Sequence, residues 1–185
     1  MTSIKQVKSE LLVLVIVLFV IIIVSGTMRV ISLLEILDPV VADIAEISAY
    51  TSLLFNSLIY MICAATPFVL ANFIAQYDKK EDDLVIFIEA IIYYVITLCF
   101  FEILKMFVSL LYFDKAIISI TDVDKMTEEI KKSTWWKYDR VIKVICAIIS
   151  ALVFFVYCYK KKKTMKFLVA TTFIIFLGSI LIVLL

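Results

Sequence analysis

Three charged residues stand inside one long apolar stretch of the chain, which runs from Leu84 to Phe113. Glu102 and Lys105 have the i,i+3 spacing that places two side chains on one face of a helix, so they suit an internal ion pair. A charge near the centre of a bilayer is costly, and such a residue is a candidate functional group whose partner should be identified. The pair predicts either a structural contact that fixes the rotation of the helix, or a cavity, an ion pathway or a subunit interface.

Glu89 is the third charge of this stretch and a separate case. On a helix it is turned away from Glu102 by about 140°. It lies close to the polar segment Asp78–Asp83, so an overlong helix would bring it near a membrane surface. Tyr93, one turn later, is a candidate hydrogen-bond partner for the Glu89 carboxylate.

The composition shows why these charges are exceptional. Of the 185 residues, 64% are hydrophobic, and the mean hydropathy is +1.11. Soluble domains are nearer half apolar, so lipid must be the solvent for much of this chain. The net charge of +1 gives no support for a nucleic-acid partner.

The inventory of chemically reactive residues is poor. Histidine is absent, which removes the commonest general base and the commonest metal ligand. The four cysteines stand apart in apolar runs without the spacing of a zinc site. We therefore expect no metal and no cofactor, and we expect the protein not to be an enzyme. A serine/lysine dyad of Ser109 and Lys105, at i,i+4, is the one catalytic arrangement that the spacing allows.

The hydropathy pattern predicts an all-α fold with a single integral membrane domain over 1–185. We expect a polytopic helix bundle of about five transmembrane helices with short interfacial or amphipathic helices. The predicted spans cover about 11–28, 47–77, 84–113, 141–159 and 167–185, and a polar loop covers 114–139.

Two details concern the ends of these helices. Small residues at Ser25 and Gly26 leave a cleavable signal peptide, over about 11–26, as the alternative to the first span. Asp38 followed by Pro39 predicts the start of the second helix, with the aspartate as its N-cap.

The second span carries polar or irregular residues at three- and four-residue intervals. They form one stripe: Asn56, Tyr60, Cys63 and Pro67. The stripe indicates either hydrogen bonds between helices or a lined cavity with a hinge at the proline. We expect its outer part, near Asn56 and Tyr60, to face Glu102.

Aromatic and basic residues mark the membrane surfaces. Trp135 and Trp136 precede the fourth span and predict an interfacial aromatic belt. A lipid-facing basic turn follows that span, and it consists of Lys160, Lys161, Lys162 and Lys163. This turn is either a topology anchor or a binding site for anionic lipids. It favours a cytoplasmic N-terminus and an external C-terminus, in a plasma or cell membrane.

These features support three hypotheses for function. The first is a non-enzymatic membrane protein that acts through a homo-oligomer or a partner protein, as a pore, a channel-like element or an accessory subunit, with immunity or phage defence as an associated role. The second is a small transporter or a substrate-binding transport subunit, whose site Glu102, Lys105 and Asn56 would line together with Asn72. The third is an intramembrane enzyme, which the missing histidine disfavours.

Overall fold

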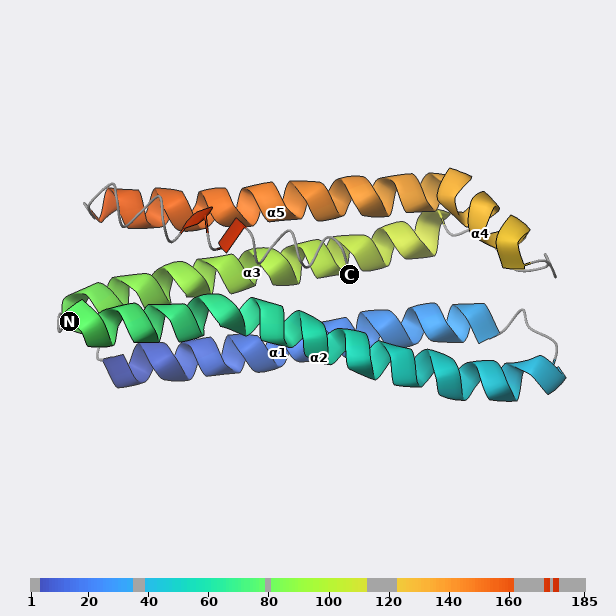
Figure 1. Ribbon diagram of the computed structural model, residues 1–185, viewed down its shortest axis with the longest axis horizontal. Helices are drawn as coiled ribbons and strands as arrows, with labels where there is room; N and C mark the ends of the chain where they lie inside the picture. The colour runs from blue at the N-terminus through green and yellow to red at the C-terminus, as the bar shows by residue number, and fades with distance from the viewer. Residues whose placement is uncertain are drawn as a thin grey trace.

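A computed structural model describes the backbone of residues 4–34, 39–78, 81–112, 123–161, 172–173 and 175–176. Within these residues the protein is all-α (Figure 1). Its five helices are α1 (Ile4–Leu34), α2 (Pro39–Asp78), α3 (Glu81–Tyr112), α4 (Val123–Lys132) and α5 (Thr134–Lys160).

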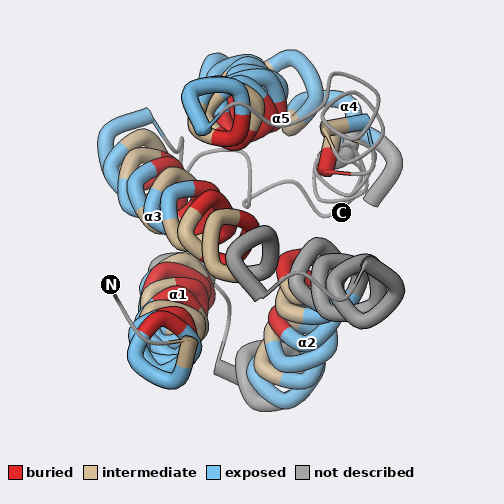
Figure 2. The backbone as a smooth tube through the Cα atoms, turned by 90° about the vertical axis from the view of Figure 1, so that its left-hand side faces the viewer, coloured by how far each residue is buried: buried red, intermediate tan, exposed pale blue. Residues whose placement is uncertain are grey.

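Helix α3 lies at the centre of the bundle. It packs against α1, α2 and α5, while α1 and α2 also pack against each other. Figure 2 shows this arrangement from one end, with α5 on one side of α3 and with α1 and α2 on the other. The short helix α4 contacts α5 and meets it at an elbow at one end of the bundle (Figure 1).

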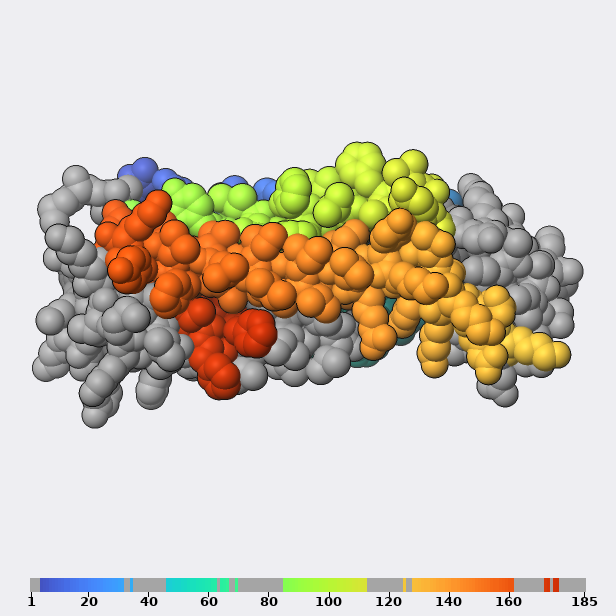
Figure 3. Space-filling model, turned by 90° about the horizontal axis from the view of Figure 1, so that it is seen from above, coloured from blue at the N-terminus to red at the C-terminus, as the bar shows by residue number. Residues whose placement is uncertain are grey.

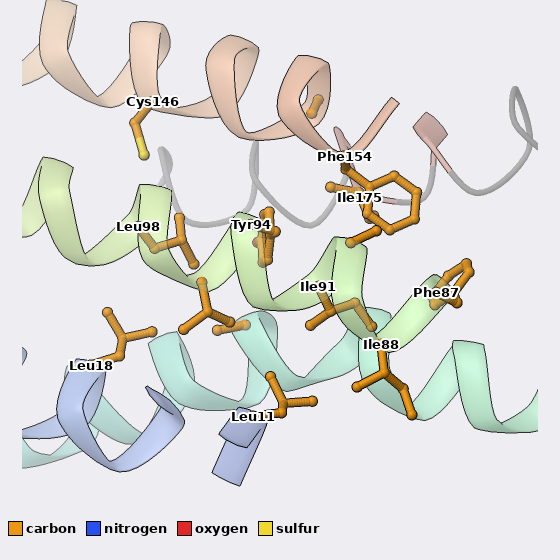
Figure 4. Packing of buried hydrophobic residues seen from close by; sticks show 14 of the residues in the cluster. Leu11, Leu18, Phe87, Ile88, Ile91, Tyr94, Leu98, Cys146, Phe154 and Ile175 are labelled. Atoms are coloured by element: carbon orange, nitrogen blue, oxygen red, sulfur yellow. The ribbon is translucent and has the colours of Figure 1, made fainter. Parts of the chain in front are cut away.

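The hydrophobic core follows α3 along its length. Figure 4 shows Ile91, Tyr94 and Leu98 of α3 between Leu11 and Leu18 of α1 on one side and Phe154 of α5 on the other. Phe87 and Phe154 meet edge to face, with ring centroids 5.1 Å apart. This core is apolar, but so are the outer faces of all four long helices, where Ile16, Phe55 and Leu111 are more than half exposed.

Among the described residues, four helices are long and apolar enough to cross a membrane. The segments that meet this description are Ile4–Ile31, Glu46–Thr66, Val85–Tyr112 and Thr134–Lys160. A continuous apolar exterior of this kind is what a lipid solvent requires and what water disfavours. Of the predicted fifth span, 167–185, the structure describes only 172–173 and 175–176, so the count of five stays a prediction.

The helices differ from the predicted spans mainly in length. Helix α1 runs without a break to Leu34, whereas we placed the end of the span at Met28. Helix α2 begins at Pro39, as the Asp38-Pro39 signal predicts, and its helical backbone continues past Pro67 to Asp78. Hydropathy alone finds the membrane-crossing part of a helix and misses the polar turns that extend it.

The predicted polar segment over 114–139 contains α4, which is one of the short amphipathic helices that we expected. Its described part, from Val123 onward, holds α4 and the beginning of α5. Ser133 separates the two helices: its hydroxyl donates to the Ile130 carbonyl at 2.6 Å and accepts from the Trp136 amide at 3.2 Å. The same serine thus closes one helix and caps the next, which makes the elbow a defined structure.

Ser25 and Gly26, the small residues of the predicted cleavage region, lie within α1 where it approaches α2. The Ser25 side chain is fully buried. A Cβ atom at Gly26 would overlap the side chain of Leu53 in α2. Small residues allow helix backbones to approach closely in membranes, so these two positions contribute to the packing of the bundle.

Candidate functional site

Glu102 and Lys105 form an ion pair on α3. The Lys105 ammonium (Nζ) contacts Oε1 of Glu102, and the two residues are 8% and 2% exposed, respectively. The spacing brings both side chains to the same face of α3, and that face is buried in the bundle. Each charge is therefore neutralised by a partner one helical turn away.

Tyr60 of α2 covers this ion pair from the neighbouring helix. Its ring centroid lies 5.6 Å from Lys105 Nζ, a cation–π distance. Its hydroxyl also interacts electrostatically with the Glu102 carboxylate. One tyrosine thus contacts both members of the pair, and the residue comes from the part of the second span that we expected to face Glu102.

Helix α5 contributes the thiol of Cys146 to the same place. Cys146 is buried, and its side chain is directed from α5 toward α3 (Figure 4). It interacts electrostatically with both Lys105 and Glu102. We name Tyr60, Glu102, Lys105 and Cys146 the central polar cluster, because these residues join three helices at one point in the interior.

Glu89 makes its contact elsewhere and with a residue that sequence reasoning missed. Tyr157 of α5 donates a hydrogen bond from its hydroxyl to Oε2 of Glu89, at 2.5 Å. Tyr93, the expected partner, instead packs its ring against the ring of Tyr157, with centroids 5.0 Å apart. Sixty-eight residues separate Glu89 from Tyr157, so no local spacing could indicate the pair.

The predicted polar stripe of α2 divides between two environments. Tyr60 is buried in the central polar cluster, whereas Asn56 is exposed on the outside of the helix. The Asn56 amide nitrogen (Nδ2) donates to the Ser52 hydroxyl at 3.5 Å, one turn earlier on the same face. The side chains of Cys63, Pro67 and Asn72 lie outside the described residues, so the cavity that the stripe predicts stays a prediction.

Trp135 and Trp136 lie in the first turn of α5, at the elbow. The Trp135 indole nitrogen (Nε1) donates to the hydroxyl of Ser109 at 3.1 Å and so ties the end of α3 to the start of α5. Ser109 is thus bound to an indole, and the Lys105 amine is bound to Glu102. No hydrogen bond joins Ser109 to Lys105 among the described residues, so the Ser109–Lys105 dyad stays a prediction.

A second ion pair lies near the elbow, and sequence reasoning missed it. Asp139 is buried and pairs with Lys143 at 3.3 Å, one turn later on α5. The i,i+4 spacing was a signal that could have identified it. The pair neutralises a carboxylate at the end of the apolar helix.

The basic turn begins where α5 ends. Lys160 is in the last turn, and the ammonium of Lys161 lies 5.6 Å from the ring centroid of Tyr157. Lys162 and Lys163 lie outside the described residues, so the role of the turn in lipid binding stays a prediction.

Among the described residues, the thiols of Cys99, Cys146 and Cys158 are free. The same part of the chain shows no cluster of three or more cysteine, aspartate or glutamate side chains that could hold a metal ion. Chemically, the central polar cluster can neutralise charge and hold three helices together.

Comparison with known proteins adds no relative to this picture. No protein-family model matches the chain, and neither a curated protein nor a solved structure shows significant similarity to it.

Proposed function

We propose that this is a non-enzymatic integral membrane protein that acts as a homo-oligomer, assembled through the outer face of α2. The proposal rests on one observation: Asn56 is exposed, although it lies in a helix segment that is long and apolar enough to cross a membrane. In this arrangement the central polar cluster is structural, since it joins α2, α3 and α5 inside each protomer.

The outer face of α2 combines one polar patch with a large apolar surface. Asn56 and Ser52 are surrounded by exposed side chains of Phe55, Ile59 and Ile62. The hydrogen bond between Asn56 and Ser52 is at the outer limit of length, at 3.5 Å, so it satisfies the amide poorly. Within a hydrocarbon solvent, the remaining donors and acceptors of an amide favour a partner on another helix.

A second copy of this chain fits the patch by its chemistry. An asparagine amide both donates and accepts, so two copies related by a two-fold axis can satisfy each other. The contact residues would be the same on both protomers, as symmetric dimers require. The proposed topology has a cytoplasmic N-terminus, which the charge pattern of the sequence supports.

Disulfide cross-linking in native membranes tests the proposal. All four native cysteines are first replaced by alanine, and a single cysteine is then introduced by Asn56→Cys. We expect a covalent dimer on mild oxidation. The matched control is Ile16→Cys, which lies at an exposed position of α1 (54%) and should stay monomeric.

Two outcomes would oppose the dimer. Equal cross-linking at both positions would indicate random collision, and a heterologous cross-linked product would indicate a partner protein in place of a second copy. Single-molecule photobleaching of the labelled protein in bilayers is an independent measurement, and a single bleaching step throughout would sink the proposal. Asn56→Leu should shift that distribution toward monomers, because it removes the amide and keeps the apolar surface.

Transport is the second candidate, and the buried pair of Glu102 and Lys105 is the observation that favours it. A proton flux into liposomes that carry an internal pH-sensitive dye would support this role if Glu102→Gln abolished it. Flux that persists in the double variant Glu102→Gln, Asn56→Ala would count against a pathway through these residues.

A further inference from the structure

A groove at the α4–α5 elbow combines three basic residues with an apolar wall. It has a volume of about 780 Å³. Lys131 comes from α4, and Lys137 and Arg140 come from the first turns of α5. The wall continues along α5 through Val141, Val144 and Ile145, and Trp136 lies at the elbow end.

The order of these residues along α5 matches the order of groups in a membrane surface. Lys137, Arg140, Val141 and Val144 recur at three- and four-residue intervals, so they share one face of the helix. The basic residues stand at the end of the helix, and the apolar ones lie one to two turns further into the segment that could cross a membrane. Figure 3 shows that α5 forms the outer layer of this face and that α4 projects at its end.

The three basic residues carry charge that no described carboxylate neutralises. Lys132, their neighbour, pairs with Glu128 at 3.7 Å and Glu129 at 3.1 Å. Lys143 pairs with Asp139. The carboxylates described near the elbow are therefore matched to other lysines, and the described residues offer no ion-pair partner to Lys131, Lys137 or Arg140.

We propose that this groove binds an anionic phospholipid. The phosphate lies among Lys131, Lys137 and Arg140, and one acyl chain lies along Val141, Val144 and Ile145. Arg140 offers a planar, always-charged guanidinium that can donate two hydrogen bonds to phosphate oxygens, whereas the lysines act as point charges. Trp136 lies at the level of the headgroup, where an indole is favoured.

This site lies at the opposite end of α5 from the basic turn, whose Lys162 and Lys163 lie outside the described residues. It also goes beyond the proposed dimer and does not depend on it, since the dimer uses α2. Both proposals need the chain to enter a bilayer, and the experiment below separates that requirement from lipid selectivity.

Quenching of tryptophan fluorescence by brominated lipids tests the proposal. The chain has two tryptophans, Trp135 and Trp136, and both lie at the elbow, where Trp136 lines the groove, so the native emission reports on this end of the bundle. The full-length protein is placed in phosphatidylcholine nanodiscs that contain a small fraction of brominated phosphatidylglycerol or brominated phosphatidylcholine. We expect the phosphatidylglycerol probe to reach half-maximal quenching at a several-fold lower fraction.

Two single-charge variants separate a site from general attraction to anionic lipid. Arg140→Gln should reduce the preference for phosphatidylglycerol by about fivefold, from about 1 kcal/mol per basic residue. Lys132→Gln removes one charge from the same region, and because that charge is paired with glutamates, it should change the preference little. Equal losses in the two variants would overturn the site.

A charge-preserving variant tests the apolar wall. Val144→Phe partly fills the groove, and the exposed position (45%) tolerates the larger ring. We expect it to weaken quenching by the phosphatidylglycerol probe while Lys131, Lys137 and Arg140 remain. An unchanged quenching curve would contradict the proposed position of the acyl chain.

Inorganic phosphate distinguishes a lipid from a soluble phosphate. Millimolar phosphate should not relieve quenching by brominated phosphatidylglycerol, since it lacks an acyl chain. Competition by phosphate alone would mean that the groove binds the free anion, and equal quenching by both lipids would refute the proposal. Failure of the chain to enter nanodiscs would instead refute the membrane assignment on which the proposed function rests.

Discussion

Glu102 and Glu89 lie on the same helix, α3, but their carboxylates bind different kinds of partner. Glu102 is bound to Lys105 on its own helix and is almost fully buried, with Tyr60 and Cys146 around it. Glu89 is half-buried and bound to the hydroxyl of Tyr157 on α5. The first contact is an internal charge balance, and the second is a link between two helices.

The difference indicates how costly each contact is to break. A carboxylate in the interior has no access to water once its cationic partner is lost. A carboxylate near the end of a helix can turn toward the membrane surface. The comparison therefore predicts a graded series of effects, which unfolding experiments in detergent or bilayers can measure.

The largest effect is expected for Lys105→Met, which leaves the Glu102 carboxyl without its cation. We expect the free energy of unfolding to fall by about 3 kcal/mol. Chemical unfolding monitored by circular dichroism measures it. The double variant Glu102→Leu, Lys105→Met should recover most of the loss, because it removes both charges together. Loss of the same size in the double variant would show that the pair is not the cause.

A smaller effect is expected for Tyr157→Phe, which removes the hydroxyl bound to Glu89 and keeps the ring packed against Tyr93. The hydrogen bond involves a charged acceptor, so we expect a loss of about 1.5 kcal/mol. The control is Tyr159→Phe, on the same helix and 59% exposed, which should be neutral. If the two variants unfold alike, the link between α3 and α5 contributes nothing measurable.

Tyr60→Phe isolates the hydroxyl in the central polar cluster. It removes the polar interaction of the hydroxyl with Glu102 and keeps the ring beside Lys105, so we expect a loss of about 0.6 kcal/mol, the average for polar contacts between helices in membranes. Tyr60→Leu should cost more because it also removes the cation–π contact. An equal loss in the two variants would assign the whole contribution to the hydroxyl.

The smallest effect is expected for Lys132→Ala on α4. Hydrogen bonding and charge attraction from Glu129, followed by Glu128, raise the pKa of Lys132 above 10.5. The stability that Lys132 contributes through this interaction is fully present below its ordinary pKa and is lost as pH rises through the raised pKa. This stability therefore does not change between pH 6 and 8. Water and salt screen an exposed pair. Thermal unfolding between pH 6 and 8 should show no difference from the parent, and a clear shift would mean that α4 is bound more tightly than its exposure indicates.

The interior of the molecule shows how far the pattern of residues predicts contacts. The Glu102–Lys105 pair follows from i,i+3 spacing, because both residues belong to one helix whose geometry is known in advance. The start of α2 at Pro39 follows from the aspartate–proline signal for the same reason. The stripe on α2 was predicted as one face, yet Tyr60 is buried and Asn56 exposed, because a small rotation of the helix decides which of its members faces α3.

The sequence predicted that Tyr60 faces Glu102, but local patterns did not predict the other contacts between helices. Glu89 with Tyr157, and Ser109 with Trp135, join residues far apart in the chain. The groove at the elbow depends on the break at Ser133, which turns Lys131 of α4 toward the first turns of α5. Such pairings depend on how the helices are rotated and offset against each other, and spacing along one helix carries no information about that.

The amino-acid sequence by itself determined that the protein is helical and that its helices suit a bilayer, because hydropathy and backbone hydrogen bonding in lipid leave few alternatives. The sequence also predicted the ion pair of Glu102 and Lys105 on the third helix. Only the tertiary structure decided that this pair is enclosed by Tyr60 and Cys146, and that Asn56 and the basic elbow remain on the outside. The physical reason is that apolar side chains cover both the core and the exterior, so hydrophobicity cannot specify which face of a helix turns inward, and packing between helices makes that choice.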